Sequence, residues 1–316
     1  MARTLLFGLL GTTLVVGAGL VGRELLFARG PQVHAHAAAV AVAVAPPLPT
    51  SAAAVAPPAP ELEARVNEVT GNAEVFVPGE GRWRPVSVGQ MLGPDAVLRT
   101  KQGRVVFGIG PGVTVSVSPS SQFRLRELST RLSKVRLEGG HVTANVDGNA
   151  NAELVLQVLG SDAEARTRDG EMAVLHSAGG RITVASSRGQ TQVSSAGSAV
   201  VVKEGQQSEV TPGSPPHAPA AIPGNVFIKL SQGQARKLSQ RSTLVEGETT
   251  PGAQVSINGV EATTNGGHFS VTVPLREGDN ALDIVARDVL GRRSSKRVGG
   301  INVDSQPPMV KGKVRW

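Results

Sequence analysis

The chain has 316 residues, enough for about two domains, and a formal net charge of +7 at pH 7. It contains no cysteine, which excludes disulfides, thiolate metal sites and cysteine nucleophiles. Aromatic residues make up only 3% of the chain, so its cores must consist mainly of Val, Leu, Ile and Ala. A basic balance is typical of proteins with anionic partners, such as nucleic acid, a membrane surface or acidic envelope polymers.

The N-terminal segment contains no charged residue from Thr4 to Gly22. As a helix these 19 residues span about 29 Å, close to the thickness of the bilayer hydrocarbon. This length predicts a signal anchor over residues 1–29, with the bulk of the chain in the periplasm and about three residues in the cytoplasm. The alternative is a signal peptide cleaved near Ala18, which would release the protein into the periplasm.

Composition divides the rest of the chain into five parts. An Ala/Pro-rich stretch at 30–60 is typical of an extended, semi-rigid linker. A strand-rich region at 61–210, a Pro-rich linker at 211–225, a second strand-rich region at 226–303 and a basic tail at 304–316 follow.

Both strand-rich regions predict an all-β fold. Residues 61–210 contain many short runs in which apolar and polar residues alternate, as in VLRTKQGRVVFGIGPGVTVSVSP. Turn residues separate the runs and no amphipathic helix interrupts them, so we expect a β-sandwich or a jelly-roll-like barrel. In residues 226–303, Asn258-Gly259 and the Asn-Gly-Gly at 265–267 indicate hairpins. These features predict a small β-sandwich.

The first region resembles the FecR family, which is named for the periplasmic regulator of ferric citrate uptake. The resemblance covers most of Val66–Val210 and rests on several motifs in order: VTGNAEVFVPGEGRWRPVSVGQML, GPDAVLRTKQGRVVFGI, VTVSVSPSSQFRL, VRLEGGHVTANV and the closing AEARTRDGEMAVLHSAGGRITVASSRGQTQVSSAGSAVVVKEGQQSEV. The chain departs from the family at 110–112, where Gly-Pro-Gly replaces the usual Asp-Gly turn.

The resemblance implies a periplasmic binding domain. Anti-sigma members of the family have a sizeable cytoplasmic segment before their membrane helix, whereas almost nothing precedes Thr4 here. We therefore expect the binding half of such a sensor without its signalling half.

The second region resembles bacterial Ig-like domains. The resemblance rests on VEGETTPGAQVSINGVEATTNGGHFSVTVPLREGDNALDIVARDVLGR, which contains the Asn-Gly hairpin and the Gly-x-Phe-Ser strand in the usual order. It implies a spacer or adhesion module.

No motif predicts catalysis. The sequence lacks a Gly-x-Ser-x-Gly elbow, a His-Glu-x-x-His pair and a phosphate loop, and its six histidines are scattered. We therefore expect no catalytic residue, no metal site and no cofactor.

Basic residues predict a binding surface. From Gly81 to Gly140 there are ten Lys or Arg against three acids. Residues i and i+2 of a strand share a face, so the basic residues should point outward while Phe123, Leu125, Val135 and Leu137 point into the core. The candidate binding residues are Arg82, Arg84, Arg99, Lys101, Arg124, Arg126, Lys134 and Arg136. The same pattern also fits a simple solvated surface.

Two functions remain open at this point. The first is a non-catalytic, membrane-anchored envelope protein whose FecR-like domain binds a periplasmic protein or an anionic envelope polymer. The second is a periplasmic signal-sensing regulator that acts through a separate membrane partner. Nucleic acid is not expected as a partner, because the chain is exported and has few aromatics for base stacking. The sequence does not predict the oligomeric state.

Overall fold

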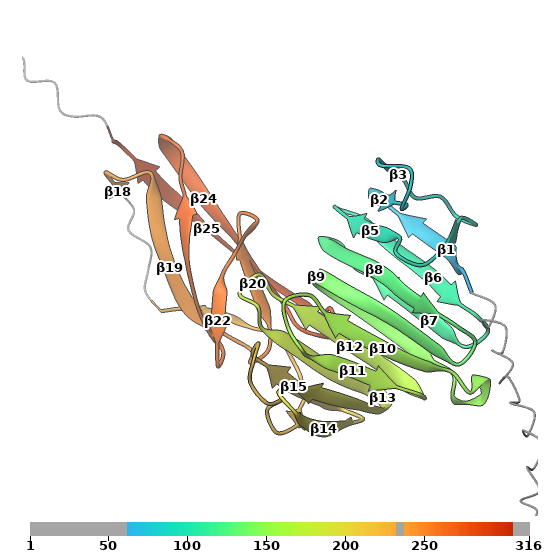
Figure 1. Ribbon diagram of the computed structural model, residues 1–316. Coiled ribbons are helices and arrows are strands. Elements are labelled where there is room, and N and C mark those ends of the chain that lie inside the picture. The colour runs from blue at the N-terminus through green and yellow to red at the C-terminus, as the bar shows by residue number, and fades with distance from the viewer. Residues whose placement is uncertain (1–61, 232–236, 306–316) are drawn as a thin grey trace, which may run out of the picture. The chain divides into compact units, whose positions relative to one another are not determined.

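The computed structural model describes residues 62–231 and 237–305, which belong to one compact unit (Figure 1). Apart from the 3-10 turn η1 (Gly148–Ala150), every regular element there is a β-strand, which confirms the all-β prediction. The predicted anchor at 1–29 and linker at 30–60 lie outside the described residues, as does the tail beyond residue 305. Among the described residues, no helix has the length and apolar character needed to span a bilayer.

The first half of the described chain contains sixteen strands joined by one continuous hydrogen-bond network. Their bounds are β1 Ala64–Thr70, β2 Ala73–Phe76, β3 Trp83–Pro85, β4 Met91–Leu92, β5 Val97–Thr100, β6 Arg104–Ile109, β7 Val113–Val117, β8 Ser121–Leu128, β9 Leu132–Val146, β10 Glu153–Val158, β11 Glu164–Thr167, β12 Gly170–His176, β13 Ile182–Ser195, β14 Ser198–Lys203, β15 Gln206–Val210 and β16 Ala220–Ala221.

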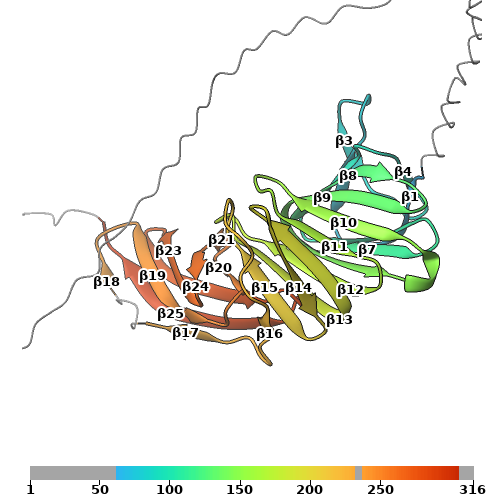
Figure 2. The same cartoon turned by 60° about the horizontal axis from the view of Figure 1, so that its bottom comes forward.

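These strands form two sheets that share β9 and β13. Sheet A has the order β4-β1-β6-β7-β9-β12-β13-β15-β16. Sheet B has the order β3-β2-β5-β8-β9-β10-β11-β13-β14. Strands β12 to β15 can be followed in Figure 2. All of these pairs are antiparallel except β9 with β10, which run parallel.

Glycine allows β9 to pass from one sheet to the other. Its first part pairs with β8 and β10 in sheet B, and from Gly140 onward it pairs with β7 and β12 in sheet A. Gly140 has φ +92°, a conformation that side-chain-bearing residues rarely adopt. β13 makes the opposite crossing next to Gly189, at φ +71°. The two sheets are therefore held together by continuous chain as well as by packing.

The core of the first half fills the space between the two sheets. Phe107 of sheet A meets Phe123 of sheet B, with ring centroids 5.6 Å apart. The four residues predicted to point inward, Phe123, Leu125, Val135 and Leu137, have no exposed surface, which confirms that part of the strand pattern. Burying such an apolar side chain contributes about 1.5–3 kcal/mol to folding.

The second half is a smaller two-sheet unit with its own core, for which the predicted sandwich is the proposed description. Sheet C has the order β17-β19-β23-β22 and sheet D the order β18-β25-β24-β20-β21. The strand bounds are β17 Ile228–Leu230, β18 Lys237–Leu238, β19 Ser242–Thr249, β20 Gln254–Ile257, β21 Val260–Glu261, β22 Thr263–Asn265, β23 His268–Pro274, β24 Gly278–Arg287 and β25 Arg293–Val303. Asn258-Gly259 joins β20 to β21, both residues at positive φ, as the hairpin signal predicted. The Ig-like identity of this sandwich stays a prediction.

The segment expected to be a Pro-rich linker contains a strand. Within residues 211–225, Ala220 and Ala221 pair with Gln207 and Gln206, so β16 extends the edge of sheet A. Ile222 follows and packs against a small apolar cluster that includes Leu175. The apolar side chain and the extended conformation that proline favours explain why this segment lies along the sheet edge.

The crossing of β9 generates a stability prediction. A Cβ at Gly140 would lie 2.3 Å from Ser121 Oγ and 2.6 Å from Ser120 O, in addition to the strain of the positive φ. We expect Gly140→Ala to lower the free energy of unfolding by roughly 2–4 kcal/mol, measured by urea denaturation. The matched control is Gly139→Ala, because a Cβ at Gly139 has no atom within 4 Å. Equal stability of the two variants would contradict this account of the crossing.

Candidate functional site

Six of the eight predicted basic residues follow the outer side of sheet B. Register places Arg124 of β8 beside Val97 of β5 and Arg136 of β9, and cross-strand partners share a face. Arg99 and Lys134 alternate with buried residues on the same strands and therefore point outward too. Lys101 directly follows β5, and Arg126 lies at an irregularity in the pairing of β8 with β9. We call these six residues and their carboxylate partners the outer face of sheet B.

Of the other two predicted residues, Arg82 precedes β3 and is exposed, and Arg84 does not lie on this face. Arg84 of β3 is paired with Val75, which has no exposed surface and belongs to the core. Arg84 therefore lies on the opposite side of the edge strand, where it forms an ion pair of 3.2 Å with Glu80. The prediction that all eight basic residues share one face is wrong for Arg84, because the side on which it lies depends on the register of β3 against β2. Trp83, and not Arg84, is the residue that shares a side with Arg99.

The outer face of sheet B carries charges of both signs. Its six cations lie among four carboxylates. The sequence predicted a surplus of basic residues and did not predict that most of them form ion pairs. The ion pairs are Arg99 and Lys101 with Glu74, Arg124 with Glu138, Arg126 with Asp95, and Lys134 with Glu127. Arg136 instead donates to the Gln157 amide oxygen at 3.5 Å. Glu74 lies outside the range Gly81–Gly140 over which the basic and acidic residues were counted, and the pairing of β2 with β5 brings it to this face.

One corner of this face is built around a tryptophan. The guanidinium carbon of Arg99 lies 3.9 Å from the Trp83 ring centroid, and Arg99 Nε donates to Glu74 at 2.6 Å. The hydrogen bond from Arg99 and the charges of Arg99 and Lys101 hold the pKa of the Glu74 carboxyl below its usual range. Phe76 adds a second ring, 5.7 Å from Trp83. The stack fixes a cation and an indole in one place, a combination common at the centres of protein interfaces.

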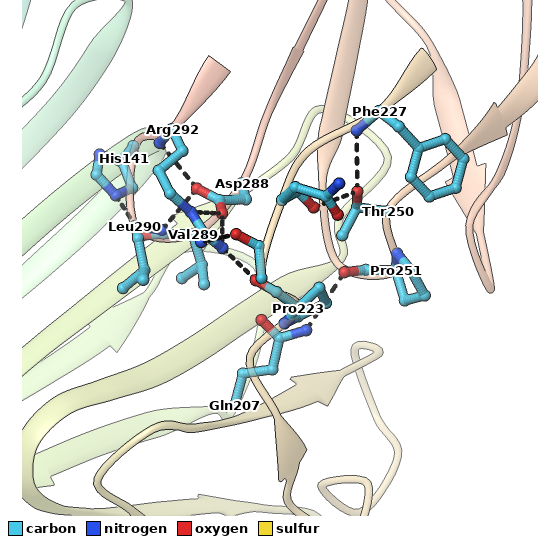
Figure 3. A network of polar contacts seen from close by, with 12 residues as sticks. His141, Gln207, Pro223, Phe227, Thr250, Pro251, Asp288, Val289, Leu290 and Arg292 are labelled. Atoms are coloured by element: carbon cyan, nitrogen blue, oxygen red, sulfur yellow. Dashed lines mark hydrogen bonds and ion pairs between the residues drawn. The ribbon is translucent and has the colours of Figure 1, made fainter. Parts of the chain in front are cut away.

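A second polar site joins the two halves of the described chain at His141 of β9 (Figure 3). The His141 ring lies on the outer side of sheet A, where Nε2 is 2.7 Å from the Val289 carbonyl oxygen and Nδ1 is 2.7 Å from Ser118 Oγ. Because a carbonyl only accepts, Nε2 carries the proton and the neutral Nδ1 accepts from Ser118. Burial lowers the pKa of His141 to about 4, so the ring is neutral at pH 7.

The turn between β24 and β25 is held by Asp288 (Figure 3). Asp288 accepts from the backbone N–H of Leu290 and of Arg292, and Arg292 Nε donates to it at 2.6 Å. Arg292 also donates to the carbonyls of Pro223 and Gly224. Val289 at the tip joins a cluster with Ala173, Leu175 and Ala185 on the outer side of sheet A. The turn thus docks on sheet A through apolar packing as well as polar contacts.

The contact between His141 and Val289, which joins the two halves, could not be predicted from the sequence. His141 and Val289 are 148 residues apart in the chain, and no local motif connects them. Across the described ranges, no group of three or more His, Asp or Glu side chains is arranged to hold a metal ion.

Comparison with known proteins gives a limited likeness. No family model matches the chain, and no curated protein matches it. Two crystal structures, at 1.65 and 2.50 Å resolution, of a protein called a "putative anti-sigma factor" from Parabacteroides distasonis ATCC 8503 are similar to part of it. Each is 14% identical with a TM-score of 0.34, and the match covers 39% of this chain and 57% of that one. At this identity and TM-score, the likeness carries no argument about family, function or partners.

The buried histidine generates a pH prediction. Its pKa is about 4 in the folded chain against an ordinary 6.5, so the unfolded state takes up the proton first. The contribution of neutral His141 is complete above pH 6.5 and is lost as the pH falls toward 4. We expect the wild type to lose about 2–3 kcal/mol more stability between pH 7.5 and 4.5 than His141→Gln, measured by urea denaturation.

The charged groups near the ring act in opposite directions on this pKa. Arg287 and Arg104 lower it and Asp288 raises it, all less than burial does. His141→Gln is the matched variant because an amide donor can reach the Val289 carbonyl without titrating. Parallel pH curves for the two proteins would show that His141 is not the group responsible.

Proposed function

We propose that this chain is a non-catalytic, membrane-anchored envelope protein whose β domain, residues 61–210, binds a periplasmic protein. The segment 1–29 would serve as the anchor in the inner membrane with the bulk of the chain in the periplasm; cleavage near Ala18 is the alternative for this segment. The binding surface in this proposal is the outer face of sheet B. A periplasmic regulator acting through a separate membrane partner remains the alternative function and would use the same surface.

The observation that carries the proposal is the fixed alternation of charge around the Trp83–Arg99 stack. Each charged side chain of the face except Arg136 is held by an oppositely charged neighbour, so the pattern is ordered before a partner arrives. A partner with a complementary pattern gains orientation and specificity from such a surface. A uniform polyanion would instead meet four carboxylates, so the pattern favours a protein over an anionic polymer.

A charge swap tests this proposal. Lys134 and Glu127 are direct cross-strand partners on the outer face, 2.7 Å apart. The double substitution Lys134→Glu with Glu127→Lys keeps the pair and the net charge but inverts the local pattern. We expect it to reduce capture of envelope proteins by the full-length chain at least tenfold, measured by quantitative mass spectrometry of detergent-solubilised envelopes.

The chain provides a matched control for the swap. Lys229 and Glu248 are also direct cross-strand partners, 3.2 Å apart, on sheet C, and their swap should leave capture unchanged. Thermal melting of both swapped proteins verifies that they fold. Binding to purified peptidoglycan and to phosphatidylglycerol vesicles, measured in parallel, tests the polymer partner. If all three proteins capture the same envelope proteins equally, the outer face of sheet B is not the binding surface.

A further inference from the structure

A cleft of about 830 Å³ lies between the two halves of the described chain. One wall comes from the first half and includes Arg99, Lys101 and His176. The other comes from the second half, where Arg287 ends β24 and Arg293 begins β25. The cleft borders the outer face of sheet B and shares Arg99, Lys101 and Glu138 with it, whereas Arg287 and Arg293 belong to the cleft alone.

Two arginines of the cleft face each other without compensation. Arg287 and Arg293 are direct cross-strand partners in the β24–β25 hairpin. Within the described part of the chain, neither guanidinium has an ion-pair or hydrogen-bond partner. Other arginines of the same hairpin do have one: Arg292 pairs with Asp288 and Arg297 with Asp283. Like charges placed directly opposite one another destabilise a hairpin. Among the described residues no ion pair offsets this repulsion.

Burial increases that cost at Arg287. Desolvation, together with the charge of Arg293, lowers the pKa of the Arg287 guanidinium. The group nevertheless stays charged at neutral pH, because an arginine guanidinium does not lose its proton in proteins. A half-buried charge without a counterion is the arrangement that an anionic ligand would complete.

Two carboxylates line the cleft, and neither forms an ion pair with Arg287 or Arg293. Of the carboxylates that line the cleft, Glu138 accepts from Arg124 and Gln122, and Glu261 accepts from the backbone N–H of Ala178. Arg99 and Lys101 share the single carboxylate of Glu74. The cleft therefore contains a surplus of cations.

A histidine contributes a further unsatisfied group. His176 ends β12 and lines the cleft, and its Nδ1 is buried with no hydrogen-bond partner among the described residues. Burial lowers the pKa of His176, so its ring is neutral at pH 7. A neutral imidazole offers one donor and one acceptor, which suits a polar ligand better than a structural role in an apolar core.

We propose that this cleft binds a doubly charged oxyanion, a phosphate group or a dicarboxylate, through Arg287 and Arg293. Guanidinium groups bind phosphate and carboxylate oxygens through paired N–H donors. Two facing guanidiniums without acid partners match two negative charges, whereas a single carboxylate would satisfy only one. Arg99 and Lys101 on the opposite wall add attraction at longer range.

Thermal melting of the full-length chain with added anions tests the proposal. Phosphate and malonate represent the two forms of the ligand, and acetate is the singly charged control, all at constant ionic strength set with sodium chloride. We expect a saturable rise in Tm with phosphate, malonate or both, and none with acetate. The double substitution Arg287→Gln with Arg293→Gln should weaken the saturable effect at least tenfold. An equal rise in this variant, or an equal rise with acetate, would overturn the proposal.

A second measurement separates a ligand site from a structural role. Arg293 is exposed, so Arg293→Gln should fold, and without added anion it should raise Tm because it removes the repulsion from Arg287. Arg297→Gln on the same strand is the matched control, because Arg297 already has Asp283 as partner, and it should not raise Tm. A lower Tm for Arg293→Gln would show that Arg293 supports the fold and would count against the site. The Lys134/Glu127 swap leaves this cleft intact, so failure of one proposal does not imply failure of the other.

Discussion

The crossing of β9 from sheet B to sheet A is the constraint on which the rest of the structure depends. Before Gly140 the strand carries Lys134 and Arg136 on the outer side of sheet B. Directly after Gly140 it carries His141 on the outer side of sheet A, where the ring meets the Val289 carbonyl. A glycine is needed because the turn of the strand brings the Ser121 side chain to within 2.3 Å of where a Cβ would stand. One backbone conformation thus positions a surface, a junction and the cleft, which Gly139 and Gly140 also line.

The described chain uses its charges in three different ways. On the outer face of sheet B the ion pairs are partly exposed, and such pairs contribute only about 0–1 kcal/mol each, so their effect is mainly to orient side chains. At the junction, Asp288 is buried and satisfied by two backbone N–H groups as well as by Arg292, which shapes the turn that docks on sheet A. In the cleft, Arg287 and Arg293 have no such compensation within the described residues. Of these three arrangements, only the one in the cleft has two described cations that both lack an ion-pair partner.

The strand pattern could be predicted from sequence because alternation is local. Phe123 and Leu125 point inward as their spacing required, and the Asn258-Gly259 hairpin forms where its turn chemistry indicated. The side on which Arg84 lies could not be predicted, because it depends on the register of β3 against β2. The ion pairs of Glu74 and the contact of His141 with Val289 also depend on residues brought together only by the tertiary fold. Arg287 and Arg293 are significant because neither has an ion-pair partner among the described residues, and no local motif encodes that.

Arg287 lines the cleft and also acts electrostatically on His141 at the junction. Its charge is one of the causes that lower the pKa of His141, and the same guanidinium is half of the proposed anion site. An oxyanion bound there would offset that charge and make protonation of the ring less costly. Because coupling between two binding equilibria is reciprocal, a proton on His141 would favour the anion by the same factor. Burial remains the larger cause of the low pKa, so this coupling would adjust the pH at which the junction weakens without removing that weakness.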